Sequence, residues 1–375
     1  MFSRKAKSLP VLIYHSINGS GLGLSVSPAL FERHCRLLAE KGWKGVGLAE
    51  AEAFLLHGET LPPRSFLLSM DDGYLDNYVY AWPILRKYGH KAVIFPVADS
   101  ISESTSLLPE GAALRPTLDD VWNGALPYSA LTFVDSPLQD GGLGFKVRRD
   151  SFFSWPEARA MEAEGSIGIG GHSLRHEAVF ISPEFNGFHQ PGPEKNAFSH
   201  TVRANCWGMP RFRRGEELLH RAFIPSAELV ERIRDLVPQD DAGAVDFFAD
   251  AEKVRRLSDL VEKFRDNLGS LESEKEQHER IYRIMHENQL VLQKELGRLV
   301  RSFCWPWGKR NALSLAAGRA AGFELFFNVG PGPNPPGRPL SINRFNAKDD
   351  PVKNLNRVRI YSRPLLGELY RRCRL

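Results

Sequence analysis

Short apolar strands alternate with helices in three separate stretches of this chain, and this alternation limits the possible folds more than any other feature. Residues 11–14 form a β-branched and aromatic run, which is followed by a glycine-rich loop and a helix with Ser27 as its expected N-cap. Units of this kind place parallel strands side by side with helices outside them. The chain is therefore expected to be an α/β protein. A distorted (β/α) barrel fits the pattern better than an open sheet, although periodicity alone does not separate the two.

The alternation resumes after a Gly- and Pro-rich region and again near the end of the chain. Further strands are expected at residues 65–70, 91–97, 166–170, 303–305, 323–329 and 341–345. Helices are expected at residues 77–88, 155–164 and 311–321, with Gly89, Gly165 and Gly322 as their stops. The barrel would thus comprise residues 1–176, with an irregular insertion at about 100–150, and residues 301–350.

A different kind of sequence separates these two parts of the barrel, at residues 177–300. Its first half is polar and loop-like, and its second half is charged and helical. Apolar residues recur there at spacings of three and four, which predicts two helices that pack as a hairpin or as a self-associating coil. An amphipathic pair lying on the barrel explains the pattern as well as an oligomerisation arm does. The residues concerned are Val254, Leu257, Val261, Phe264, Leu268 and Leu271, then Ile281, Met285, Leu292, Leu296 and Leu299.

Charge and cysteine content narrow the class of protein. Lys and Arg number 49 against 45 Asp and Glu, an excess too small to bind a nucleic acid by phosphate neutralisation. Residues 351–375 form a basic tail, which is expected to be a solvated helix or a peripheral contact with an anionic membrane. The four cysteines are widely spaced, and the first ten residues lack the apolar core of a signal peptide. These features lead us to expect a cytoplasmic protein.

Two adjacent carboxylates, Asp71 and Asp72, follow an apolar strand and precede Gly73. Successive side chains at a strand end point in different directions, so one carboxylate can bind a metal while the other faces a substrate. A lone Asp-Asp-Gly, however, is usually only a turn.

Two histidines, His172 and His176, follow another predicted strand and the pair Gly170-Gly171. Imidazoles four residues apart can converge on one cation when the segment makes a helical turn. Both motifs lie at the carboxyl end of a predicted parallel strand, where α/β barrels assemble their sites. One carboxylate and two histidines form the three-ligand set of an open, catalytic metal centre.

These motifs resemble those of the polysaccharide deacetylases, carbohydrate esterase family four, which share the NodB homology domain. The family's first motif, Thr-Phe-Asp-Asp-Gly, is similar to residues 69–73, and its second, His-(Ser/Thr)-x-x-His, matches residues 172–176 without change. The resemblance covers residues 10–97, 155–179 and 301 to about 345. It implies a NodB-like barrel, related to the TIM barrel, to which this chain's own apolar pattern adds a largely helical insertion.

The resemblance also implies a role for each matching residue. Asp72, His172 and His176 would hold a divalent metal, usually zinc, and Asp71 would be the general base that activates water. In the branch of the family whose N-terminus reads Tyr-His, the motif order is permuted and this histidine is the general acid. His15 is therefore the candidate proton donor to the leaving amine, and a histidine that merely caps the barrel is the alternative.

Four further residues are expected to line the substrate: Tyr74, Trp305, Trp307 and Arg344. The backbone N–H of Tyr74 could hold the oxyanion. Residues 305–308 look like the family's Tyr-Pro-x-Gly segment, whose aromatic rings would suit a sugar, although ordinary barrel packing explains both tryptophans equally well. Arg344 could orient the catalytic aspartate.

The implied activity is removal of N-acetyl groups from a sugar in a polysaccharide, an oligosaccharide or a lipid-linked glycan precursor. Three departures from the family stand out: Ser69-Met70 replaces Thr-Phe, the Arg-x-Pro version of the third motif is missing, and the insertion of about 120 residues is unusual. The expected cytoplasmic location favours a precursor of a surface polysaccharide as the substrate. A hydrolase of a non-sugar C–N bond and an inactive glycan-binding or scaffolding relative are the alternatives.

Overall fold

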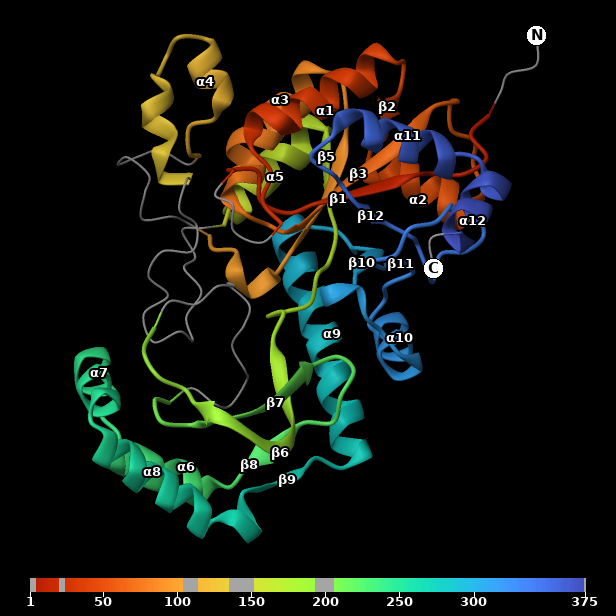
Figure 1. The fold of residues 1–375 in the computed structure, drawn as a ribbon. Helices are drawn as coiled ribbons and strands as arrows, with labels where there is room; N and C mark the ends of the chain where they lie inside the picture. The colour runs from red at the N-terminus through yellow and green to blue at the C-terminus, as the bar shows by residue number, and fades with distance from the viewer. Residues whose placement is uncertain (1–4, 20–23, 104–113, 135–151, 193–205, 374–375) are drawn as a thin grey trace.

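Parallel strands form the centre of the molecule (Figure 1). The computed structural model describes residues 5–19, 24–103, 114–134, 152–192 and 206–373. Strands β1 (Val11–Tyr14), β3 (Ser65–Asp72), β4 (Ala92–Pro96), β5 (Ile167–Ile169) and β12 (Phe345–Asn346) lie in the order β12-β1-β3-β4-β5, and every neighbouring pair is parallel. The short β2 (Lys44–Gly45) pairs with the beginning of β3.

Isolated bridges close this sheet into a ring. Gly171, just after β5, forms a parallel bridge with Phe303 of β10 (Ser302–Cys304). Strand β10 pairs in parallel with β11 (Leu325–Phe327), and Phe327 forms a parallel bridge with Ile342, shortly before β12. The prediction of a distorted barrel rather than an open sheet is therefore confirmed.

Helices surround the barrel, and local sequence signals set their ends. They are α1 (Pro28–Glu40), α2 (Leu48–His57), α3 (Trp82–Lys87), α5 (Trp155–Glu164) and α10 (Ala312–Ala320). The Ser27 side chain accepts a hydrogen bond from the backbone of Leu30 and so caps α1 as predicted. The helix expected at residues 77–88 is instead a π-helical turn, Asn77–Ala81, that continues into α3. Strand β2 and helix α2 had no counterpart among the predicted elements.

The first part of residues 177–300 forms a separate lobe, which lies below the barrel in Figure 1. Strands β6 (Ala178–Phe188) and β7 (Pro210–Glu216) form an antiparallel hairpin, so the predicted loop-like character of this part is wrong. Strand β8 (Phe223–Pro225) pairs with β9 (Gly269–Leu271). Helices α6 (Ala227–Leu236), α7 (Asp241–Ala249) and α8 (Ala251–Lys263) pack with these strands around a core of their own that includes Phe180, Phe212, Phe247 and Leu257.

The two amphipathic helices of the insertion pack on different partners, which corrects the predicted helical hairpin. Strand β9 separates α8 from the long α9 (Glu274–Leu296). Leu257 of α8 lies in the core of the lobe, whereas Ile281 and Met285 of α9 lie in the core of the barrel, where α9 packs against α10. The apolar faces considered for self-association are thus largely covered within the chain, although Leu271 and Leu299 are exposed.

The basic C-terminal tail is folded against the barrel. Helix α11 (Pro351–Tyr361) packs on α1 and buries Leu355, Val358 and Tyr361. The prediction that the tail is a solvated helix is therefore wrong for its first half, which α11 forms. Helix α12 (Pro364–Arg372) follows and exposes several leucines. None of the described helices is both long and apolar enough to cross a membrane.

Candidate metal centre and active site

The residues singled out by the sequence motifs gather at the carboxyl ends of the barrel strands. Asp71 and Asp72 end β3, and His172 and His176 follow β5 in a loop of residues 170–177, here called the histidine loop. His15 directly follows β1. Parallel strands bring their carboxyl ends to one edge of a barrel, and this is why segments far apart in sequence meet here.

Asp72, His172 and His176 form a compact set of metal-binding groups. One donor atom of each lies within 4.8 Å of the others, and all three side chains are buried. The Nδ1–H of His172 donates to the backbone carbonyl of Cys304 at 2.9 Å, which turns Nε2 toward Asp72, 3.5 Å from its Oδ1. A hydrogen bond of this kind to the other ring nitrogen is typical of histidine ligands to metals. Two imidazoles and one carboxylate suit zinc or another divalent transition metal.

The electrostatics of these groups also suit a cation. Burial opposes the ionisation of Asp72, but the hydrogen bond with His172 outweighs it and lowers the pKa of the carboxyl group. Burial likewise opposes protonation of His172, but Cys304 and Asp72 raise its pKa well above the usual value. Asp72 and His172 thus prefer a positive charge between their donor atoms, and a metal ion in place of the proton would satisfy the same preference. Burial and the neighbouring His172 lower the pKa of His176 to about 3, so its imidazole is neutral, as a ligand must be.

Backbone strain is concentrated around this site. Positive φ angles occur at Asp72 (77°), Ser173 (71°), His176 (54°) and Trp307 (52°). Such conformations cost about 1–3 kcal/mol each for residues other than glycine and persist only where the surroundings enforce them. Gly73 also has a positive φ, of 84°, and a Cβ there would lie 2.7 Å from Pro96. The turn after the two aspartates therefore requires glycine.

Asp71 is held by a buried arginine. Nη1 and Nη2 of Arg344 donate to the two carboxylate oxygens of Asp71 at 2.6 and 2.8 Å, and Nη1 also donates to Ser69 Oγ at 3.0 Å. Burial opposes the ionisation of Asp71, but Arg344 outweighs it and holds the pKa of Asp71 well below its usual range. Arg344 has no exposed surface, so it does not line the proposed substrate site. Its two hydrogen bonds instead orient the carboxylate of Asp71, which is the role that the sequence suggested for it.

His15 lies near the carboxylate of Asp71. Its Nε2 lies 3.9 Å from Oδ2 of Asp71, and about one fifth of its side chain is exposed. Two neighbours in the turn after β3 fix its backbone: Asn77 Nδ2 donates to the carbonyl of His15 at 2.7 Å, and Ser16 Oγ donates to Asp76 Oδ2 at 2.6 Å. His15 is thus a partly accessible imidazole on a fixed backbone.

Of the three aromatic residues expected near the substrate, Trp305 lies elsewhere. Its side chain is fully buried and packs against Phe303 and Phe326 in the core, so the expectation that it contacts substrate is wrong, and the alternative of barrel packing is correct. Trp307 is 37% exposed, and its ring centroid lies 4.3 Å from that of His176. Tyr74 is largely buried and interacts with Asp72 through its hydroxyl group.

The structure adds neighbours of the site that sequence reasoning missed. Cys304 accepts a hydrogen bond from Arg344 Nη2 at 2.7 Å, and its sulfur lies 3.6 Å from Asp71 Oδ2. Asp76 supports the His15 segment, as described above. The position of Cys304 at a strand end could have indicated it, but no local pattern indicated Asp76.

The residues of this site lie in a part of the chain that is similar to known proteins. Residues 58–190 match the model of the polysaccharide deacetylase family. This range includes both aspartates and both histidines of the site. Over these residues the chain is similar to the polysaccharide deacetylases.

Similar proteins are found at the levels of sequence and fold. YxkH of Bacillus subtilis, assigned to the polysaccharide deacetylases, is 39% identical over 108 residues, which are 29% of this chain and 38% of that protein's length. A de-N-acetylase from Aggregatibacter actinomycetemcomitans superposes with a TM-score of 0.56 at 19% identity, over 92% of this chain and 98% of the other.

Two further solved structures share the fold of this chain. The BpsB deacetylase domain of Bordetella bronchiseptica has a TM-score of 0.53 and 18% identity, over 91% of this chain and 96% of the other. IcaB of Ammonifex degensii also has a TM-score of 0.53, with 17% identity, over 96% of this chain and 98% of the other. At these identities the likeness concerns the fold, and it extends over the insertion as well as the barrel.

Proposed function

We propose that this chain is a metal-dependent hydrolase that removes the N-acetyl group from a sugar in a polysaccharide, an oligosaccharide or a lipid-linked glycan. One observation carries the proposal: the donor atoms of Asp72, His172 and His176 lie within 4.8 Å of one another, directly beside the ion-paired Asp71. The name of the A. actinomycetemcomitans neighbour, a de-N-acetylase, favours an N-acetyl group as the one removed.

A bound divalent cation, proposed to be zinc, would polarise the acetyl carbonyl and lower the pKa of water. Asp71 would accept the proton of the attacking water. Its pKa is low because of Arg344, so it is ionised at neutral pH, and the bidentate ion pair keeps its oxygens in one orientation. The weak basicity of such a carboxylate is sufficient only when the water is itself made acidic, which agrees with a cation beside it.

His15 would donate a proton to the leaving amine. Its Nε2 lies 3.9 Å from Asp71 Oδ2, and its partial exposure would give a substrate access to the ring. A protonated imidazole within reach of the leaving amine can serve as its general acid. The hydrogen bonds that hold Ser16 and the carbonyl of His15 would keep the ring in place.

Trp307 is the proposed contact for the sugar ring. Its partly exposed indole packs beside His176, so a sugar lying on it would reach the metal ligands. The apolar face of a pyranose packs well on an aromatic ring. The backbone N–H of Tyr74 stays a proposed contact for the oxyanion.

We further propose that the substrate is a cell-envelope glycan precursor and that the enzyme works at the cytoplasmic face of a membrane. Helix α12 supports this location, because Leu365 and Leu369 are 89% and 61% exposed and lie on a helix that ends with Arg371 and Arg372. Basic amphipathic helices bind anionic bilayers through such residues. Sedimentation with vesicles of anionic lipid, with Leu365→Ser/Leu369→Ser as the comparison, tests this point; equal binding of the two proteins would contradict it.

The decisive experiment for the activity is acetate release. Zinc-reconstituted protein is incubated with N-acetylglucosamine oligosaccharides and with lipid-linked N-acetyl sugars, beside Asp71→Asn and His172→Ala. Release by the wild type and its loss in both variants would support the deacetylase. Metal binding without acetate release would favour a hydrolase of another C–N bond, and neither metal nor activity would favour a glycan-binding or scaffolding protein.

A further inference from the structure

The insertion supplies two buried polar side chains that contact the histidine loop. Glu217, directly after β7, is 2% exposed, and Asn288 of α9 is fully buried. Both lie at least 40 residues beyond the loop in the sequence, outside residues 58–190, which match the family model.

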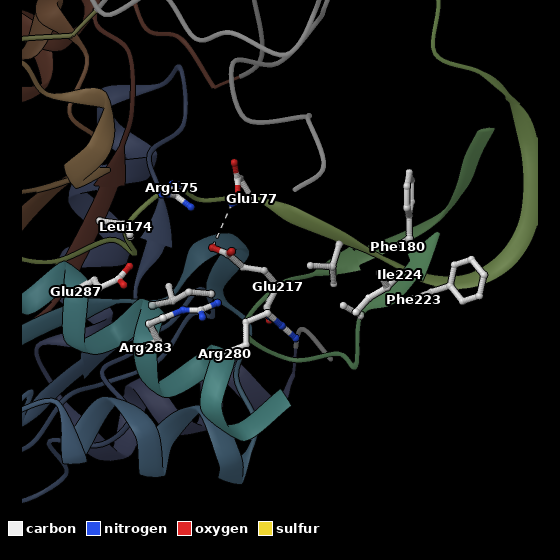
Figure 2. A pocket seen from close by; sticks show the side chains of 13 residues that line it. Leu174, Arg175, Glu177, Phe180, Glu217, Phe223, Ile224, Arg280, Arg283 and Glu287 are labelled. Carbon is white, nitrogen blue, oxygen red and sulfur yellow. Dashed lines mark hydrogen bonds between the residues drawn. The ribbon is translucent and has the colours of Figure 1, made fainter. Parts of the chain in front are cut away.

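One carboxylate oxygen of Glu217 contacts the two residues that directly follow the histidines, Ser173 and Glu177. Ser173 Oγ donates to Oε1 of Glu217 at 3.0 Å, and the backbone N–H of Glu177 donates to the same atom at 3.3 Å. Figure 2 shows Glu217 directed toward Glu177, between the histidine loop and α9. Because Ser173 and Glu177 directly follow His172 and His176, this contact fixes the spacing of the two proposed ligands.

Asn288 holds the same segment from another direction. Its Nδ2 donates to the carbonyl of Ser173 at 3.0 Å, and its Oδ1 lies so close to Gly171 that a Cβ there would be 2.8 Å away. Ser173 thus has its hydroxyl group held by Glu217 and its carbonyl group held by Asn288. These contacts explain how Ser173 keeps its left-handed conformation, with φ of 71°.

Glu217 is itself anchored by α9. Arg280 donates through Nη1 to the carbonyl of Glu217 at 2.5 Å and through Nη2 to the carbonyl of His220 at 2.7 Å. The same guanidinium forms a buried ion pair with Glu272 at 2.7 Å. A rigid connection therefore runs from the helix through Arg280 and Glu217 to the loop that carries the two histidines.

From this connection we infer that the insertion completes the metal centre, with Glu217 and Asn288 as positioning residues for His172 and His176. The inference rests on the proposed function, because it assumes that these histidines bind a metal. According to this inference, the insertion increases the affinity of the site for metal by holding His172 and His176 in position, whether or not it also contacts the substrate. Residues that orient metal ligands typically change metal affinity about 10–100-fold when they are removed.

The test measures zinc affinity by competition with a chromophoric chelator. Glu217→Ala and Asn288→Ala are expected to weaken binding about 10–100-fold. Glu217→Gln keeps an acceptor oxygen at the same place and is expected to retain most of the affinity. Glu231→Ala and Gln293→Ala, which alter exposed residues of α6 and α9, are the matched controls.

Three comparisons separate the possible results. The melting temperature of each chelator-treated variant checks that the fold is intact, and Glu217→Gln and Asn288→Ala keep the test valid if Glu217→Ala does not fold. Zinc affinities of folded Glu217 and Asn288 variants within twofold of the controls would overturn the inference. His176→Ala is measured in parallel: wild-type zinc affinity in this variant would instead contradict the proposed function, so the two failures are distinguishable.

Discussion

The guanidinium group of Arg344 donates to both carboxylate oxygens of Asp71, at 2.6 and 2.8 Å, and both residues are buried. The two residues are 273 positions apart, and they meet because β12, which directly follows Arg344, lies beside β1, and β1 lies beside β3, the strand that carries Asp71. The ion pair keeps Asp71 charged in a buried site.

Loss of this arginine should therefore affect both stability and activity. Arg344→Met leaves the charge of Asp71 buried without a partner, and a cost of about 3–5 kcal/mol in the free energy of unfolding is expected. Arg344→Lys keeps a positive charge but not the two-pronged geometry, so a smaller loss of stability with a clear loss of kcat is expected. Chemical denaturation and acetate-release kinetics measure the two effects. Arg319→Met, on the exposed side of α10, is the control, and an equal loss in this variant would refute the account.

Metal removal should destabilise the protein only while the three proposed ligands are intact. A ligand present at 100 times its Kd stabilises the native state by about 2.7 kcal/mol. Zinc added to chelator-treated wild-type protein should thus raise the melting temperature. Asp72→Ala, His172→Ala and His176→Ala should show little response. A rise of wild-type size in all three variants would place the metal elsewhere.

Substitution of His15 should separate proton donation from metal binding. General acid catalysis contributes about 10²–10⁴-fold in rate, so His15→Ala is expected to lower kcat by this order. Its zinc content and melting temperature should stay at wild-type values, because His15 is not one of the three proposed ligands and is partly exposed. A kcat within threefold of wild type would show that another group donates the proton.

Local sequence signals predicted the barrel elements well. Strand β1 (Val11–Tyr14) and helix α5 (Trp155–Glu164) have the predicted bounds. For α5 the reason is visible, since Ser154 and Glu157 form a capping box and Gly165 ends the helix with φ of 87°. The aspartates and histidines of the site were likewise found from short motifs at strand ends.

The remaining features depend on contacts that a local pattern does not contain. An apolar helical stripe indicates that a helix is covered but does not name its partner, and this is why α8 and α9 were predicted to pair although one covers the lobe and the other the barrel. Glu217 is an ordinary glutamate in the sequence and becomes part of the site only through Ser173, 44 positions away. Trp305 and Trp307 are two residues apart, and their opposite environments follow from a turn with positive φ at Trp307.

The two tryptophans should respond in opposite ways to substitution. Trp305→Ala removes a fully buried ring and is expected to cost about 3–5 kcal/mol of stability. Trp307→Ala should leave the melting temperature nearly unchanged and raise KM for the oligosaccharide, since its ring is partly exposed beside His176. Kinetics and thermal unfolding of both variants check this; a stable Trp305→Ala with a raised KM would reverse the assignment.

His34 should make the folded state sensitive to mild acid. It is a buried residue of α1 on the side that packs on α11, where its ring contacts the Tyr14 hydroxyl group at 2.8 Å and Asn354 Nδ2 at 3.3 Å. Burial, and then Arg33, lower its pKa to about 4 from the usual 6.5. Between these two pH values the unfolded chain binds a proton that the native state does not, so the contribution of His34 is present above pH 6.5 and is lost as the pH falls toward 4.

The expected size of this loss follows from the shift in pKa, and a substitution isolates it. Each unit corresponds to about 1.4 kcal/mol, so His34 should account for roughly 3 kcal/mol of the fall in stability between pH 7 and pH 4. His34→Gln should be less stable at pH 7 but flatter in its pH dependence. Denaturant unfolding of chelator-treated protein across this range measures the slope, with His57→Gln at the exposed end of α2 as the control. Because His57 is exposed, its variant should keep the wild-type slope; equal slopes in all three proteins would mean that His34 does not titrate between the two states.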